Sequence, residues 1–296
     1  MVRHTLKMSS SVVPFLAAGK AKSSMVKKVL MILGAALVIL VGGTWLGLQV
    51  ASNRFDSIPA GHAPDTVPIP AGLPAPVERF ARVVYGDAIP VVESAVVIGR
   101  ARLAPTGLPM PARFRFYYDA RRSSHYHEIE VTWFKLPLMR IHERNLEGHA
   151  TLDLSLFGKV DDQPHTNRAG IQGYWSEVLA WVPAITLTDP RVTWEPFDDN
   201  TARLILPELD PVEALTVIFD PESGLLDRID TMRYQSEENP DRLGWHNRAF
   251  NWQLLNGTVV PLTSTTQWGD AAPWATWEID DVSLNVEVSE RFAAFG

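Results

Sequence analysis

Two histidines, His125 and His127, are the side chains in this sequence best placed to bind a metal ion together. The residues around them alternate between polar and apolar, which predicts a strand, and side chains two apart on a strand share a face. With His142 or His149 on a neighbouring strand they could chelate zinc. The alternative, histidines at a rim near a turn, is the commoner arrangement, so we predict no metal and no cofactor.

Glu177 is the carboxylate best placed for acid–base chemistry. It lies in a segment of helical periodicity, about 120° from the centre of the apolar stripe. Gly173, one turn earlier, would leave room beside it. One hypothesis is a solvated glutamate on the exposed face of the helix. The other places the carboxylate at the edge of a groove, where it binds a polar head or acts as a general base.

Aromatic residues suggest a cleft. Nine of the ten tryptophans follow residue 56, and large rings on a half-open sheet either fill a core or line an apolar cleft. Under the second interpretation, the candidate ligand-binding residues are Trp133, Tyr174, Glu177, Trp181 and Trp252. An enzyme is the less favoured interpretation, because the sequence contains no nucleophile elbow, phosphate-binding loop or zinc-protease motif.

Charge is distributed unevenly along the chain. Residues 1–55 contain seven Lys and Arg and no acid, whereas residues 56–296 contain the other 20 Lys and Arg and all 34 Asp and Glu. Nucleic acid is excluded as a partner of such an acidic body, since binding to phosphates depends on Lys and Arg. The lack of cysteine excludes disulfides, thiolate metal sites and cysteine nucleophiles.

Residues 29–50 form a stretch of 22 residues without a charge. As a helix it would be about 33 Å long, enough to cross a hydrocarbon core of roughly 30 Å. The alternative is a cleaved signal peptide. Six of the seven basic residues precede the span, which predicts an N-terminus inside and a periplasmic or extracellular body. We therefore predict a basic cytoplasmic tail (1–28), a transmembrane helix (29–50), a proline-rich spacer that lifts the body off the bilayer (51–77) and one β-rich domain (78–290).

The body alternates with a period of two in most segments, which predicts strands. Asn256-Gly257 is typical of a two-residue hairpin turn. An apolar stripe over residues 171–182 predicts a helix that ends at Pro183, and a shorter helix is predicted over residues 76–85. The fold class is therefore α+β: a curved, half-barrel-like antiparallel sheet packed on one or two helices and preceded by one transmembrane helix. The strand segments are residues 113–118, 125–133, 150–157, 215–219 and 226–234.

Several phrases resemble a bacterial family of uncharacterised, often membrane-anchored proteins, catalogued as a domain of unknown function. They are LPAPVERF (73–80) followed by Gly86, Glu147-Gly148 leading to LSLFG, YWSEVLAWVPA (174–184), VTWEPFDD (192–199), VIFDPESGLLDRID, and FNWQLLNGTVVP followed by Trp268. A looser similarity in fold is to the half-barrels that carry lipoproteins across bacterial envelopes.

The leading functional hypothesis is a membrane-tethered module that binds a lipid, an acyl chain or a lipidated partner in a cleft lined by Trp133, Trp181 and Trp252. The second is an envelope hydrolase that uses Glu177 together with another polar group such as His246. The third is a structural or assembly protein without a pocket, for which an exposed apolar patch would be the sign.

Overall fold

The computed structural model describes residues 17–293, with side chains from residue 25 onward. The chain divides into two compact units, Met1–Gly47 and Leu48–Gly296, each considered by itself. Residues 1–16 of the predicted basic tail lie outside the described residues.

The described part of the first unit consists of helix α1 (Ala17–Gln49) as far as Gly47. Its segment Met25–Gln49 is the one helix among the described residues that is long and apolar enough to cross a membrane by length and composition. Most of its large apolar side chains are exposed, as Ile39 is. These properties fit both the predicted anchor and a signal sequence.

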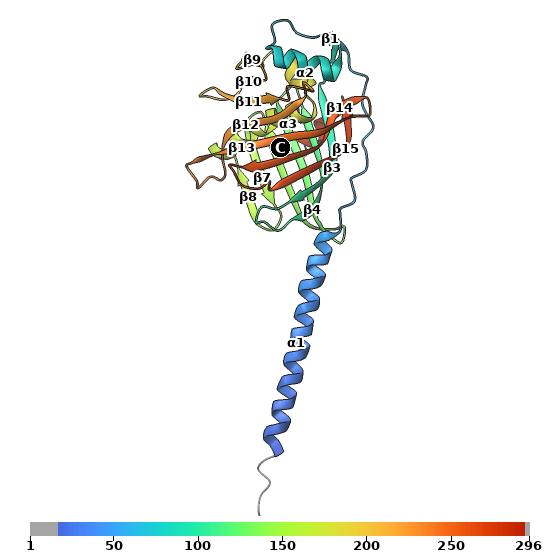
Figure 1. Ribbon diagram of the computed structural model, residues 1–296, viewed down its shortest axis with the longest axis vertical. Helices are drawn as coiled ribbons and strands as arrows, with labels where there is room; N and C mark the ends of the chain where they lie inside the picture. The colour runs from blue at the N-terminus through green and yellow to red at the C-terminus, as the bar shows by residue number, and fades with distance from the viewer. Residues whose placement is uncertain (1–16, 294–296) are drawn as a thin grey trace, which may run out of the picture. The chain divides into compact units, whose positions relative to one another are not determined.

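The second unit is built on one antiparallel sheet of 13 strands (Figure 1). The strand order is β8-β7-β6-β5-β4-β3-β15-β14-β13-β12-β11-β10-β9, so β8 and β9 are the edges and the sheet is open. A separate two-stranded ribbon pairs β1 (Thr66–Pro68) with β2 (Ala88–Pro90). The strands of the large sheet are β3 (Ser94–Leu103), β4 (Met110–Asp119), β5 (Ser124–Trp133), β6 (Leu136–Leu146), β7 (His149–Leu154), β8 (Gly158–Asp161), β9 (Thr193–Pro196), β10 (Thr201–Leu206), β11 (Glu213–Phe219), β12 (Leu226–Tyr234), β13 (Arg242–Leu255), β14 (Thr258–Trp268) and β15 (Ala275–Leu284).

Helix α3 (Pro164–Trp181) lies inside the curve of the sheet, because it contacts strands from both halves: β6 and β7 on one side, β10, β12 and β14 on the other. Its stripe residues, such as Trp175 and Val178, are fully buried. The predicted end before Pro183 is confirmed, while the start lies earlier than the stripe because Glu237 accepts hydrogen bonds from the first-turn amides of His165 and Thr166.

Three further helices complete the described part of the chain. Helix α2 (Ala75–Tyr85) packs through Phe80 against Phe219 of β11 and Trp252 of β13. Helices α4 (Ala184–Thr188) and α5 (Ser289–Ala293) are each five residues long. The predicted α+β class, a curved antiparallel sheet packed on helices, is confirmed.

The alternation predicted for β4 separates two environments. Phe114 and Phe116 face the interior, whereas Arg113 and Arg115 face outward. On the outer face Arg113 pairs with Glu130, the residue opposite it on β5. Glu130 is nevertheless only 4% exposed, because Arg113 and Arg140 enclose its carboxylate.

Residues 51–77, predicted to be a spacer, lie along the body. The Ser52 hydroxyl is 2.6 Å from that of Thr132, and the ring of Phe55 lies 4.3 Å from the guanidinium carbon of Arg113. The prolines do keep this segment extended, but the apolar residues between them give it surface to bury. Those that pack on the body are Phe55, Ile58, Val67, Ile69 and Leu73.

Glu130→Gln tests the outer ion-pair network. Removing the charge while Arg113 and Arg140 remain is expected to lower the free energy of unfolding at pH 7 by about 1–3 kcal/mol. Burial alone would raise the pKa of Glu130, but the two arginines outweigh it and leave this pKa below its ordinary value. Such a carboxylate stabilises the fold above its unfolded-state pKa and loses that effect as the pH falls through its folded-state pKa.

The difference in melting temperature between wild type and variant should therefore narrow below about pH 4. Glu278→Gln, at a more exposed pair with Arg100, is the control and should cost less than about 1 kcal/mol. If both variants lost the same free energy of unfolding, Glu130 would not have the special stabilising role proposed for it.

Candidate functional site

A cavity of about 650 Å³ lies between helix α3 and the concave face of the sheet. Aliphatic side chains of β5, β6 and β7 line one wall: Ile129, Val131, Met139, Ile141, Leu152 and Leu154. Tryptophans of the opposite half line the other: Trp245, Trp268, Trp274 and Trp277. The third hypothesis, a protein without a pocket, does not fit this interior.

The lining changes from apolar to polar along β5 and β6. The register pairs Val131 with Met139, Ile129 with Ile141, and His127 with Glu143. Four residues of strand separate the first pair from the third, about 13 Å. The cavity is therefore apolar towards the β5–β6 hairpin and polar at the opposite, inner end.

At the hairpin end the lining includes exposed apolar side chains. Leu156 and Phe157 lie in the turn between β7 and β8, and both are mostly exposed. Leu138 of β6 also lines the cavity and is exposed. These residues form an apolar rim, defined here as Leu138, Leu156 and Phe157.

The inner end holds a group of polar residues from four elements. Glu177 of α3 approaches His127 of β5, with Oε2 2.9 Å from Nε2. The Tyr118 hydroxyl of β4 donates to the same Glu177 oxygen at 3.0 Å. Glu143 of β6 lies on the other side of His127, with Oε2 3.6 Å from Nδ1.

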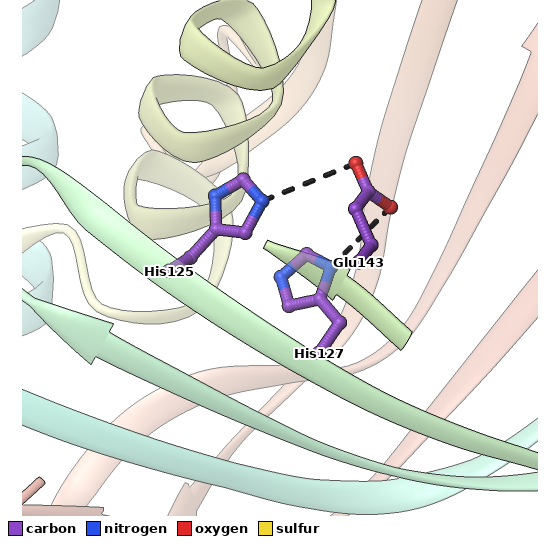
Figure 2. Close-up of side chains that lie close together, drawn as sticks. All are labelled: His125, His127 and Glu143. Carbon is purple, nitrogen blue, oxygen red and sulfur yellow. Dashed lines mark ion pairs between the residues drawn. The ribbon is translucent and has the colours of Figure 1, made fainter. Parts of the chain in front are cut away.

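His125 lies beside His127, and both are almost fully buried. Their rings stack with centroids 4.2 Å apart and planes 8° apart. Figure 2 shows that the Glu143 carboxylate faces both rings, one oxygen towards each. Among the described residues, neither ring nitrogen of His125 has a hydrogen-bond partner.

Burial and charge set the protonation of these groups. Burial lowers the pKa of His125, the neighbouring His127 lowers it further, and His125 is neutral at pH 7. Burial would also lower the pKa of His127, but Glu177 and Glu143 raise it to about 9. Burial would raise the pKa of Glu143, yet its contacts with His127 bring it to about 2. Without a bound ligand, a histidine cation thus lies between two glutamates.

Arg233 of β12 completes the inner end. It lines the cavity, donates from Nη2 to the carbonyl of Ala169 at 2.8 Å, and lies 4.0 Å from the ring of Trp245. Burial lowers the pKa of Arg233 from its very high ordinary value, although it remains charged at pH 7.

Of the predicted binding residues, Glu177 and Trp181 line the cavity. Trp133, Tyr174 and Trp252 are not among the described residues that line it. Trp133 ends β5 and its ring lies on Phe134. Tyr174 is fully buried and its ring packs edge-on to Trp175. The ring of Trp252 packs edge-on against Phe80, and its indole N–H donates to the carbonyl of Leu226.

The proposed solvated position of Glu177 is wrong, since the carboxylate lies at the edge of the cavity against His127 and is 18% exposed. The predicted histidine partners are also wrong. The register places His142 opposite Glu128 on the outer face, where it pairs with Tyr126, and His149 pairs with Asp162. His246 pairs with Asp230 rather than with Glu177.

Three members of the site, Tyr118, Glu143 and Arg233, are not among the residues predicted from the sequence. Tyr118 shares the inward face of β4 with Phe114 and Phe116, and the strand pattern alone does not separate a core ring from one whose hydroxyl has a polar partner. Glu143 and Arg233 belong to segments with several charges, where no local signal distinguishes an inward charge from a solvated one.

Several solved structures match most of this chain at low sequence identity. A DUF1329 family protein from Desulfovibrio piger is 10% identical with a TM-score of 0.42, covering 73% of this chain and 93% of that one. A LolA superfamily protein from Nitrosomonas europaea is 12% identical with a TM-score of 0.41, covering 75% and 98%. A putative outer membrane lipoprotein-sorting protein domain from Vibrio parahaemolyticus is 9% identical with a TM-score of 0.41, covering 73% and 92%.

No curated protein sequence matches the chain. Its residues 66–279, which contain the cavity and the polar group at its inner end, match the model of a family of unknown function, DUF6544, and the chain belongs to that family.

Proposed function

We propose that this protein is a membrane-tethered module that binds an elongated apolar molecule, a lipid, an acyl chain or a lipidated partner, outside the cytoplasmic membrane. The observation that carries the proposal is the largely apolar cavity with a polar inner end. Its volume of about 650 Å³ lies within the usual range for small-molecule sites. It is about four times the roughly 150 Å³ that accommodates benzene.

The polarity of the lining fits an amphipathic occupant. An acyl chain would lie along Ile129, Ile141 and the tryptophan wall, where burying it removes apolar surface from water. Its polar end would meet the group at the inner end, where Arg233 carries a positive charge. The charge around the N-terminal span supports a body outside the cytoplasmic membrane, since six of the seven basic residues in 1–55 precede residues 29–50.

A second candidate function is hydrolysis of an ester in the bound molecule. It is favoured by the 2.9 Å contact between His127 and Glu177, because catalytic bases are typically oriented by a neighbouring polar group. Here Glu177 would accept the proton of the attacking water. Binding requires only the cavity, whereas hydrolysis also requires the Glu177 carboxylate. A single variant at Glu177 therefore distinguishes the two candidate functions.

Filling the cavity should abolish binding. In Ile141→Trp the larger ring occupies the space of the ligand, and the affinity of the full chain in detergent for a fluorescent fatty acid should fall at least tenfold, which corresponds to about 1.4 kcal/mol. His142→Trp, one residue away on the outer face, is the matched control and should bind within twofold of wild type. A filled variant that is folded and still binds normally would count against the cavity as the site.

The rim should govern transfer from a membrane. Leu138→Asp combined with Phe157→Asp places charges at exposed apolar positions of the rim, which should slow uptake of the fatty acid from phospholipid vesicles at least fivefold, measured by stopped-flow fluorescence. Equilibrium affinity for the same probe added from solution should change little. Val212→Asp, an equally exposed apolar site away from the cavity lining, is the control. Unchanged uptake by the rim variant would show that the occupant does not enter there.

Glu177→Gln distinguishes the two candidate functions. If the protein only binds, the variant keeps its affinity for the fatty acid and neither form hydrolyses a p-nitrophenyl acyl ester above the background rate. If it is a hydrolase, wild type cleaves the ester and the variant loses at least 100-fold in kcat. His149→Ala, at an exposed histidine, should match wild type in either case.

A further inference from the structure

Three side chains that commonly bind metals converge at the inner end of the cavity: His125, His127 and Glu143 (Figure 2). One potential ligand atom from each lies within 4.8 Å of the others. The β5–β6 register brings them together, since it places Glu143 opposite His127, two residues from His125 on the same face. The arrangement therefore depends on backbone pairing.

The distances fit ligands around an ion better than hydrogen bonds. Glu143 Oε2 lies 3.6 Å from His127 Nδ1, and Oε1 lies 3.9 Å from His125 Nε2. Both exceed the usual 2.7–3.2 Å of a hydrogen bond. Two ligands each about 2.1 Å from a tetrahedral ion are about 3.4 Å apart, so small movements would bring these atoms to coordinating distance.

His125 needs a partner that the described residues do not supply. Its side chain is fully buried, and both of its ring nitrogens lack a hydrogen bond. A buried polar atom without a partner is unfavourable, and a metal ion would be that partner for one nitrogen. The stacked rings must rotate for both to coordinate one ion. Within the described part of the chain no hydrogen bond restrains the His125 ring, and Gly173, which has no side chain, lies beside it.

His127 already has the support typical of a metal ligand. Ligating histidines usually donate their other ring N–H to a carboxylate, which fixes the tautomer and the ring orientation. Here Nε2 is 2.9 Å from Glu177 Oε2, an ion-pair distance without hydrogen-bond geometry, so a small rotation of the ring is needed to complete the bond, and Tyr118 donates to the same oxygen. Metal binding would displace the Nδ1 proton of the His127 cation and leave the other proton on Nε2, beside Glu177. Glu177 and Tyr118 are thus positioning residues for this ligand.

We propose that His125 Nε2, His127 Nδ1 and the carboxylate of Glu143 bind one divalent transition-metal ion of the Zn²⁺ class. Two imidazoles and a carboxylate suit zinc and its neighbours better than calcium or magnesium, which prefer oxygen ligands. His127 and Glu143 also line the cavity. A three-residue site there leaves a coordination position directed towards the cavity, for water or for an oxygen of the occupant. The site does not depend on what occupies the cavity.

The test uses the full chain in detergent, without a polyhistidine tag and treated with a chelator that is then removed. Titration with Zn²⁺ alone, followed by calorimetry and metal analysis, should give one ion per chain and a rise in melting temperature. Co²⁺ should give the visible absorption bands of a tetrahedral or five-coordinate ion. Failure of the wild-type chain to bind either ion stoichiometrically would overturn the proposal, whatever the fatty-acid probe does.

Variants locate the ion. His125→Asn and Glu143→Gln should each weaken Zn²⁺ binding at least 100-fold, with far-ultraviolet circular dichroism confirming the fold. Glu177→Gln keeps all three ligands and should weaken it about 10–100-fold, as loss of a supporting carboxylate does. His149→Ala should bind as wild type does. If His149→Ala loses the ion, or if folded His125→Asn and Glu177→Gln retain full affinity, the proposed site is wrong.

Discussion

The position of helix α3 within the curved sheet is the constraint on which the rest of the body depends. One helix of 18 residues cannot fill the concave side of 13 strands, and the space that it leaves is the cavity. Carboxylates from the far half of the sheet hold the helix there. Glu208 accepts from the indole of Trp175, and Glu213 accepts from the amide of Gln172, both at 2.7 Å. Polar contacts on one flank of the helix thus preserve an apolar space on the other.

The inner end of that space brings together charges that are costly to bury singly. His127 is stabilised by two carboxylates, and each carboxylate gains from its proximity to the histidine. The group combines residues from β4, β5, β6, β12 and α3, so its geometry exists only in the folded chain. Its neighbours are apolar, which strengthens every electrostatic interaction within it.

Local features were predictable from the sequence, and features set by long-range pairing were not. The helix end before Pro183, the hairpin at Asn256-Gly257 and the limits of β12 depend on residues adjacent in sequence, and they were predicted correctly. The common face of His125 and His127 follows from the period of a strand. The third member, Glu143, depends on the register of β6 against β5, which no short window specifies. The same limit applies to residues 51–77, whose proline content predicts an extended chain without showing that Phe55 has Arg113 to pack against.

The openness of the sheet has a consequence for the behaviour of the protein in concentrated solution. Its two edges, β8 and β9, carry backbone amides and carbonyls that could pair with another chain. Edge strands promote aggregation most when they are long and flat. Both edge strands are four residues long. Lys159 places a charge on one, and Pro196 removes an amide donor from the other. This sheet does not close into a barrel, and its interior stays accessible. Its short, interrupted edge strands therefore have to prevent pairing between copies of the protein.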